Sequence, residues 1–340
     1  MDDSLAARFN GVQLDSDDDG NASHPFQPHP SVRLAPTPRY LFRVFTPKSR
    51  GLTSPSWAVS ACALSDPSSD LVLDRRVPAS ASTVTTDVFR MEKRQAAGMI
   101  SRHLQWRDNP ADNLVSWTSS LPFALFYMFH LYASHRDGSA FSDIKICIID
   151  TTLFPDQVFI RDKDLIDAFR DYDRSLDGFA NLRRTRDPDL GSYSYFGEHL
   201  SQGFLDIQSK CQVVSAHDLI DHGLYQLLPQ LRNFQEGLST SSIPWAKEVM
   251  QLRRDLYIHP LLVLEMGSAT ERRKAALSIA SLFRPPWRMP MAIRLITMVT
   301  DLWDTEETLK IFRRASFTGL SFLISKTESL GNIVRLIWNN

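Results

Sequence analysis

Apolar residues along the chain follow two different spacings, which divide it into two regions. Between residues 39 and 229, short runs alternate with the two-residue period of strands and are separated by helical segments. Beyond Pro229 no strand pattern is clear, and apolar residues recur at helical spacing. We therefore predict an α+β domain over 39–229, followed by an all-α C-terminal domain over 240–340.

The first region contains one strand that is largely apolar on both faces. Residues 39–45 read RYLFRVF, and a strand of this kind is typical of the centre of a sheet. Arg43 is the exception within it, because a buried arginine is costly unless it is paired. Further strands are predicted at 113–118, 143–150, 158–160, 193–203 and 211–215, and helices at 83–108, 123–131, 164–172 and 218–228.

The segment from Asn113 to His130 is the most informative stretch of the chain. Its strand carries Ser116 and Thr118 on one face by the two-residue period, and a turn with Pro122 then leads into a strongly apolar helix. A strand that presents small hydroxyls and leads into a buried helix is suited to form the floor of a pocket.

Other segments lack a clear pattern or belong to the helical region. Residues 1–38 carry an acidic run and several prolines, which is typical of a disordered tail. Residues 46–82 are rich in Ser, Pro and Asp and are predicted to be irregular, and 181–188 to be a charged loop. In the C-terminal region, helices are predicted at 244–258, 270–283, 291–303 and 304–324, with a last turn near 332–338.

Composition narrows the classes of function. Hydrophobic residues make up 43% of the 340 residues, charged residues 23%, and the net charge is −1. A large core is therefore available, and there is no strong nucleic-acid signal. The three cysteines are scattered without metal-site spacing, which favours a reducing compartment. No signal peptide, transmembrane stretch or membrane partner is predicted, so an intracellular protein, cytoplasmic or nuclear, is expected.

Three polar features occur in order on three predicted strands: Arg43, then Ser116-Trp117-Thr118, then Glu198. This order resembles the Arg–Ser–Glu branch of the ADP-ribosyltransferase superfamily, and also a widespread fungal domain that combines the same pieces. YLFRVF is similar to the family's first strand and FGEHLSQG to its glutamate segment. The resemblance covers about residues 39–228. It implies a split, mixed β-sheet core with flanking helices.

The resemblance also implies roles for individual residues, with NAD as the substrate. Glu198 would stabilise the oxocarbenium-like centre that forms when the nicotinamide–ribose bond breaks. Ser116 would orient Glu198, and both are expected to be catalytic. Arg43, Thr118 and Tyr195 are expected to bind NAD, with Arg43 near the pyrophosphate or a ribose and Tyr193 or Tyr195 stacked on nicotinamide. The product would be ADP-ribose transferred to a protein acceptor or to water.

Two departures from the family pattern keep a second hypothesis open. The middle strand reads Ser-Trp-Thr rather than Ser-Thr-Ser, and Phe196 stands where many arginine-modifying members have Glu or Gln. The alternative is therefore a catalytically inactive member of the fold that acts as a protein-interaction module. A mixed α+β domain unrelated to NAD, with Arg43 and Glu198 on opposite faces, is the third option.

Other constellations are poorer. His217, Asp218, Asp221 and His222 have a spacing that could bring metal ligands together, but a capped, solvated helix explains them as well, so no metal site is predicted. A hydrolase triad built on Ser116 or Ser120 with Asp150 lacks the usual nucleophile motif. His199 is expected to be structural and Trp117 to pack into the core.

Overall fold

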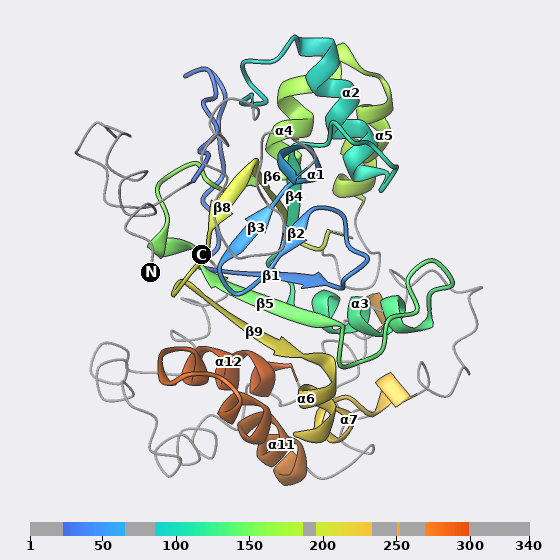
Figure 1. Ribbon diagram of the computed structural model, residues 1–340, viewed down its shortest axis with the longest axis vertical. Coiled ribbons are helices and arrows are strands. Elements are labelled where there is room, and N and C mark those ends of the chain that lie inside the picture. Colours follow the sequence, from blue (N-terminus) through green and yellow to red (C-terminus); the bar gives the residue numbers. More distant parts are fainter. Residues whose placement is uncertain (1–22, 65–85, 186–194, 233–249, 252–268, 299–340) are drawn as a thin grey trace, which may run out of the picture.

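The structure is a computed structural model, and it describes residues 23–64, 86–185, 195–232, 250–251 and 269–298 (Figure 1). A six-stranded sheet crosses the middle of the molecule, and helices gather at its two ends. Its strands, in spatial order, are β6 (Ile160–Arg161), β7 (Glu198–Gln202), β4 (Leu114–Thr118), β1 (Tyr40–Phe45), β5 (Lys145–Asp150) and β9 (Cys211–Ser215).

Every pair of neighbouring strands in this sheet is antiparallel. The predicted α+β class is confirmed, whereas the expectation of a mixed sheet is wrong for the described strands. β1 lies at the centre, as its two apolar faces predicted. It pairs with β5 over the whole of 40–45, but with β4 only at Phe42 and Thr118. The sheet is therefore weakly joined between β1 and β4.

A second, three-stranded antiparallel sheet lies against the first. It consists of β2 (Leu52–Thr53), β3 (Trp57–Val59) and β8 (Phe204–Asp206), and α1 (Ala61–Leu64) follows β3. Gly51 allows the turn into β2: its φ is +70°, and a Cβ there would lie 2.1 Å from the carbonyl oxygen of Val59. This part of 46–82 is ordered into strands, contrary to the prediction of an irregular segment. Residues 65–82 lie outside the described part of the chain.

The helices begin where the sequence supplies caps. Glu92 caps α2 (Lys93–Leu104), Ser120 caps α3 (Leu121–Ala133), and Ser215 caps α6 (Ala216–Asp221), each accepting a backbone N–H with its side chain. The other helices are α4 (Asp162–Phe169), α5 (Ser175–Arg184), α7 (Leu224–Leu227), α11 (Ala269–Ser281) and α12 (Pro285–Thr297), with short 3-10 turns at Thr151–Leu153, Arg170–Tyr172 and Pro229–Leu231.

Several helix boundaries differ from those predicted; α2, predicted over 83–108, is helical only over Lys93–Leu104. α5 occupies residues expected in part to form a charged loop, because Leu176 and Ala180 at helical spacing bury one face. α12 begins at Pro285, since a proline in the first helical turn loses no intrahelical hydrogen bond. None of the helices in the described ranges is long and apolar enough to cross a membrane.

The six-stranded sheet separates three hydrophobic clusters. One lies between α2, α4 and α5 and the strands β4, β6 and β7, and a second fills the space beside the small sheet. The third and largest joins α3, β1, β5 and β9 to the helices α6, α7, α11 and α12. Strand residues follow the two-residue period between clusters: Leu114 faces the first cluster, while Val115 and Trp117 face the second.

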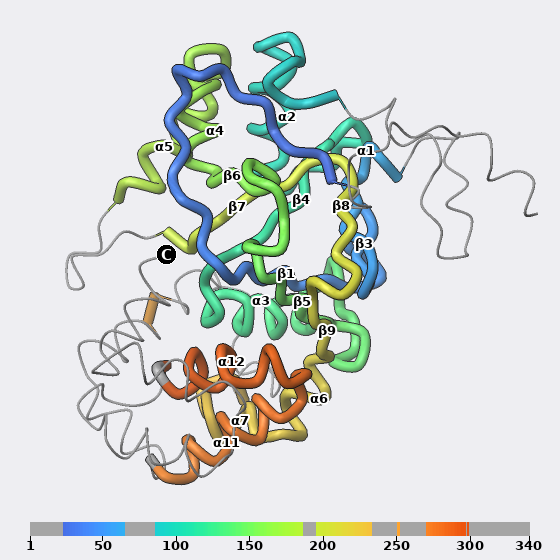
Figure 2. The backbone as a smooth tube through the Cα atoms, turned by 90° about the vertical axis from the view of Figure 1, so that its left-hand side faces the viewer, coloured from blue at the N-terminus to red at the C-terminus, as the bar shows by residue number. Residues whose placement is uncertain are grey.

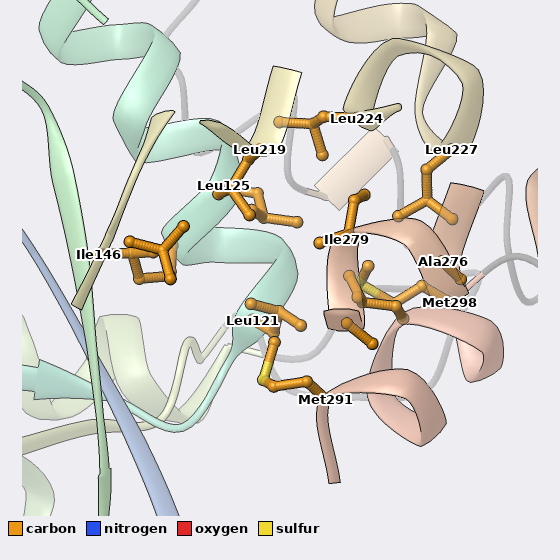
Figure 3. Packing of buried hydrophobic residues seen from close by; sticks show 14 of the residues in the cluster. Leu121, Leu125, Ile146, Leu219, Leu224, Leu227, Ala276, Ile279, Met291 and Met298 are labelled. Carbon is orange, nitrogen blue, oxygen red and sulfur yellow. The ribbon is translucent and has the colours of Figure 1, made fainter. Parts of the chain in front are cut away.

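The described C-terminal helices pack into the core of the sheet domain. Figure 3 shows Ile279 of α11 and Met291 of α12 among Leu121 and Leu125 of α3, with Ile146 of β5 in the same cluster. These two helices were predicted as part of a separate domain over 240–340. They share one hydrophobic core with the sheet instead. Most of the rest of that range lies outside the described residues.

An extended N-terminal segment also belongs to the folded body. Residues 23–38 run past Phe159 and the start of α4 before entering β1 (Figure 2). Phe26 is 1% exposed in the cluster beneath α2, and the backbone N–H of Ala35 donates to Asp164 at 2.8 Å. The prediction of a disordered tail up to residue 38 is therefore wrong for 23–38. Residues 1–22 lie outside the described part.

Phe26 gives a test of how strongly this segment holds the domain. Phe26→Ala should lower the free energy of unfolding by about 3–5 kcal/mol, because it leaves a cavity in a closed cluster. Urea denaturation at equilibrium measures the loss. Leu153→Ala is the control, since Leu153 is 49% exposed and its truncation should change stability by no more than about 0.5 kcal/mol. Equal, small losses would mean that the segment contributes little.

Candidate active site

Glu198 and Ser116 meet on neighbouring strands. β7 pairs with β4 so that Glu198 stands opposite Thr118 and Leu200 opposite Ser116. The two side chains are therefore diagonal neighbours on one face of the sheet. The Ser116 hydroxyl donates to Glu198 Oε1 at 3.0 Å. This is the contact that the family resemblance implied for these two residues.

Arg43 on β1 contacts the backbone of Ser116. Its Nη1 donates to the backbone carbonyl oxygen of Ser116 at 3.0 Å, and its Nε donates to the Thr53 hydroxyl at 2.8 Å. The guanidinium thus links β1 to β4 near the single backbone pair of the two strands. Burial lowers the pKa of Arg43, and nearby Tyr127 opposes that shift, but an arginine remains a cation at neutral pH.

The second oxygen of Glu198 is held by a cation from α5. Arg183 Nη2 lies 3.0 Å from Glu198 Oε2, and Arg183 Nε lies 2.8 Å from Asp162 Oδ2. Asp162 is the first residue of α4 and is fully buried, and Glu198 keeps 20% of its side-chain surface exposed. One guanidinium therefore serves two carboxylates that would otherwise repel each other across a poorly solvated space.

Glu198 is disposed to hold a proton more readily than an ordinary glutamate. Burial raises the pKa of Glu198, and the negative charge of Asp162 raises it further. Arg183, His103 and the Ser116 hydroxyl act in the opposite direction, because each favours the ionised carboxylate. Burial thus favours the protonated carboxyl group, whereas the hydrogen-bonding neighbours favour the carboxylate. Opposing influences of this kind are common for groups that transfer protons.

His103 and Asp112 extend the arrangement behind Ser116. His103 lies near the end of α2, and its Nε2 is 2.7 Å from Ser116 Oγ. Its Nδ1 is 2.8 Å from Asp112 Oδ2. The side chains of His103 and Asp112 are 10% and 6% exposed. Four polar side chains from Asp112 to Glu198 therefore form a continuous hydrogen-bonded row.

Thr118 has a different role from the one predicted. Its hydroxyl donates to the carbonyl oxygen of Phe196 and accepts the backbone N–H of Ser120, and the residue is 7% exposed. It fixes the turn that leads into Glu198 rather than facing a ligand. Gly197 completes this turn: its φ is +66°, and a Cβ there would lie 1.8 Å from the Ser119 hydroxyl oxygen.

Tyr195 is likewise committed to the protein through its hydroxyl. The phenol lies 2.8 Å from Asp162 Oδ1 and 2.7 Å from the carbonyl oxygen of Glu198. Burial raises the pKa of Tyr195 well above its usual value, and the charge of Asp162 adds to the effect. Tyr195 therefore positions Glu198 through its hydroxyl, and the stacking of its ring on nicotinamide stays a prediction. Tyr193, the other predicted stacking residue, lies outside the described residues.

Two structural expectations hold. Trp117 is 2% exposed and donates its indole N–H to the Ser201 hydroxyl at 2.9 Å, so it packs in the core as predicted. His199 is 3% exposed, and its Nδ1 lies 2.9 Å from the carbonyl oxygen of Gly197. It alternates away from Glu198 along β7, which makes it structural.

Sequence reasoning missed the other polar residues of the site. His103 falls within the helix predicted at 83–108, and Arg183 within the predicted charged loop. Asp112 lies before β4 and Asp162 begins α4, and the sequence pattern does not fix the first residue of either element. The one available signal was the position of His103, a titratable side chain on the buried face of an amphipathic helix.

The alternative constellations fare differently. Across the described ranges, no group of three His, Cys, Asp or Glu side chains is placed to hold a metal ion. His217 and Asp221 form an exposed pair on α6, with Nε2 and Oδ2 3.3 Å apart. Asp150, proposed as a triad member, instead pairs with Arg39 at 3.0 Å. The carboxylate that does lie behind a histidine and Ser116 is Asp112.

Comparison with known proteins gives one family match. Residues 36–178 match the model of a domain of unknown function (DUF7587). The match includes Arg43, His103, Ser116 and Asp162 but ends before Arg183 and Glu198. No curated protein and no solved structure matches the chain.

Arg183 provides a stability test of the charged cluster. Arg183→Met should lower the free energy of unfolding by about 3–5 kcal/mol at neutral pH, because Asp162 and Glu198 would lose their shared cation. Chemical denaturation measures the effect. Because Arg183 lowers the pKa of Glu198, its removal leaves a carboxyl that protonates more easily, so the loss should shrink as the pH falls.

Arg184→Met is the matched control. Arg184 is the next residue of α5, and its pair with Asp167 is half exposed on both sides. Such surface pairs contribute about 0–1 kcal/mol. Similar losses for the two variants would contradict the buried cluster described above.

Proposed function

We propose that this chain consumes NAD, transferring ADP-ribose to an acceptor or to water. The observation that carries the proposal is the convergence of Arg43 and Glu198 on Ser116, from three separate strands. The order and types of these residues resemble the Arg–Ser–Glu ADP-ribosyltransferases. Glu198 contacts the Ser116 side chain, and Arg43 contacts the Ser116 backbone carbonyl.

Glu198 is the proposed catalytic residue. Cleavage of the nicotinamide–ribose bond leaves positive charge on the ribose, and a carboxylate beside that ring stabilises it. The nicotinamide departs with the bonding electron pair, and the acceptor oxygen or nitrogen forms the new bond to the same carbon. Ser116 and Arg183 hold the two carboxylate oxygens in place, so the charge is oriented before the sugar binds.

Arg43 is the proposed contact for the anionic part of NAD. Its described hydrogen bonds use Nε and Nη1, so Nη2 is the end of the guanidinium that a phosphate would approach. A planar guanidinium already fixed by two protein contacts loses little side-chain freedom when it binds a phosphate. Phe196 offers no acidic or amide partner for an arginine acceptor, so the acceptor is an unassigned protein or water.

A second candidate is a non-catalytic interaction module with the same fold. The observation that favours it is the ion pair at Glu198 Oε2, where Arg183 already occupies the oxygen that a ribose hydroxyl would contact. In that case Glu198 would be part of a structural charge cluster. Isothermal titration with NAD separates the two, because the module would not bind the nucleotide.

Replacement of Glu198 tests the enzymatic proposal. Glu198→Gln keeps the size and a hydrogen-bond acceptor but removes the charge, so the rate of NAD consumption should fall by about 10²–10³-fold. The rate is measured by chromatography of nicotinamide released by the full chain. Glu271→Gln on the exposed side of α11 is the control and should leave the rate unchanged. A wild-type rate no higher than that of Glu198→Gln, with both proteins folded, would rule out catalysis by this site.

Replacement of Arg43 tests nucleotide binding. Arg43→Lys keeps the positive charge but loses the planar fork, so we expect KM for NAD to rise by about 10-fold with a smaller change in kcat. Arg39→Lys is the control, because Arg39 is 58% exposed and pairs with Asp150 at the start of the same strand. An unchanged KM in Arg43→Lys would place the pyrophosphate elsewhere.

A further inference from the structure

We propose that His103 receives the proton that Glu198 removes during the reaction, through the hydroxyl of Ser116, and that Asp112 positions His103 for this task. The inference rests on the proposed function, and it adds two residues and a proton route to it. The route is short: His103 Nε2 lies 2.7 Å from Ser116 Oγ, which lies 3.0 Å from Glu198 Oε1.

Asp112 fixes which nitrogen of the imidazole carries a proton. One carboxylate oxygen, Oδ1, accepts the backbone N–H of Leu114 at 3.0 Å. The other, Oδ2, lies 2.8 Å from His103 Nδ1. A carboxylate that accepts hydrogen bonds on both oxygens requires Nδ1 to be the donor. Nε2, which faces Ser116, is therefore the nitrogen that can gain or lose a proton.

The Ser116 hydroxyl has one proton and two polar neighbours, which leaves two complete arrangements. In the first, Nε2–H of a cationic His103 donates to Ser116, and Ser116 donates to the Glu198 carboxylate. In the second, a protonated Glu198 donates to Ser116, and Ser116 donates to a neutral His103. Every donor has an acceptor in both arrangements, which differ only in the location of one proton.

The transfer between these arrangements balances without another reactant. The proton of Glu198 passes to Ser116 Oγ as the hydroxyl proton of Ser116 passes to His103 Nε2. In the full reaction, an acceptor O–H forms its bond to the ribose carbon as nicotinamide leaves with the electron pair of the C–N bond. The acceptor proton goes to Glu198, then through Ser116 to His103, and finally to solvent. Glu198 is restored as a carboxylate.

Charged groups surround both ends of the proposed proton route. Around Glu198, burial and Asp162 raise its pKa, while Arg183 lowers it. Tyr195 contacts the backbone of Glu198 and the carboxylate of Asp162. Around His103 the facing groups are Asp112 and Ser116. The guanidinium of Arg43 lies on the carbonyl side of Ser116.

The first experiment needs no turnover. Long-range ¹H–¹⁵N spectra of histidine-labelled full chain follow the His103 ring as the pH is changed, with His103→Gln identifying its signals. In a chain that keeps Ser116, we expect Glu198→Gln to change the pH response of His103 Nε2 strongly. In a Ser116→Ala background the same change should have a several-fold smaller effect, because the hydroxyl link is gone. His222 serves as the unaffected reference, because it follows α6, which lies at the opposite end of the molecule from α2 (Figure 1).

An effect of Glu198→Gln that is absent, or equal with and without the Ser116 hydroxyl, would overturn the proposal. The outcome is independent of NAD consumption. If the coupling is present but NAD is not consumed, the proposed function fails, and only the hydrogen-bonded coupling of Glu198, Ser116 and His103 stands. If NAD is consumed and the coupling is absent, the proposed function stands without this route.

The second experiment measures catalysis. His103→Gln and Asp112→Asn should each lower kcat for NAD consumption on the order of 10²-fold with little change in KM, because neither residue contacts the nucleotide. An unchanged kcat in both folded variants contradicts the proposal. Asp112, His103 and Ser116 also have the hydrogen-bond pattern of a serine nucleophile. Covalent labelling of Ser116 by a fluorophosphonate would therefore assign it as a nucleophile and overturn the proton route.

Discussion

The burial of one carboxylate constrains the centre of this molecule. Glu198 has only a fifth of its side chain exposed, and an ionised group at that depth is stable only with partners on both oxygens. Those partners come from different parts of the chain. Ser116 is on β4, Arg183 on α5, and Asp162 at the start of α4 balances Arg183 in turn. The site is therefore complete only when these elements are packed together.

The weak junction between β1 and β4 explains why an arginine is present in a central strand. The two strands share a single backbone pair at Phe42 and Thr118, and beyond it the Arg43 guanidinium contacts the carbonyl oxygen of Ser116. A side chain thus replaces the ladder of hydrogen bonds that would close the sheet. The same contact holds the Arg43 guanidinium against the backbone of the strand that carries Ser116.

Segments remote in sequence support this centre from outside. The N-terminal segment 23–38 covers the cluster beneath α2, from which His103 reaches Ser116. On the other side, α11 and α12 bury α3, whose N-cap, Ser120, donates its backbone N–H to Thr118. Packed elements at both ends of the molecule therefore contact β4, the strand that carries Ser116. The predicted α+β domain and the described C-terminal helices therefore share one core.

The sequence by itself determined the strands at 39–45, 113–118 and 211–215, the apolar helix after Ser120, and the α+β class. These follow from local periodicity and capping, which operate within a few residues. It also singled out Arg43, Ser116 and Glu198, by order and type rather than by any distance.

The tertiary structure alone decided the antiparallel pairing, the burial of Phe26, and the roles of His103, Asp112, Asp162 and Arg183. Each of these depends on a contact between elements far apart in the chain. A charged residue on a helix or in a loop has the same local pattern whether it faces solvent or a buried carboxylate, and only the packed neighbours distinguish the two.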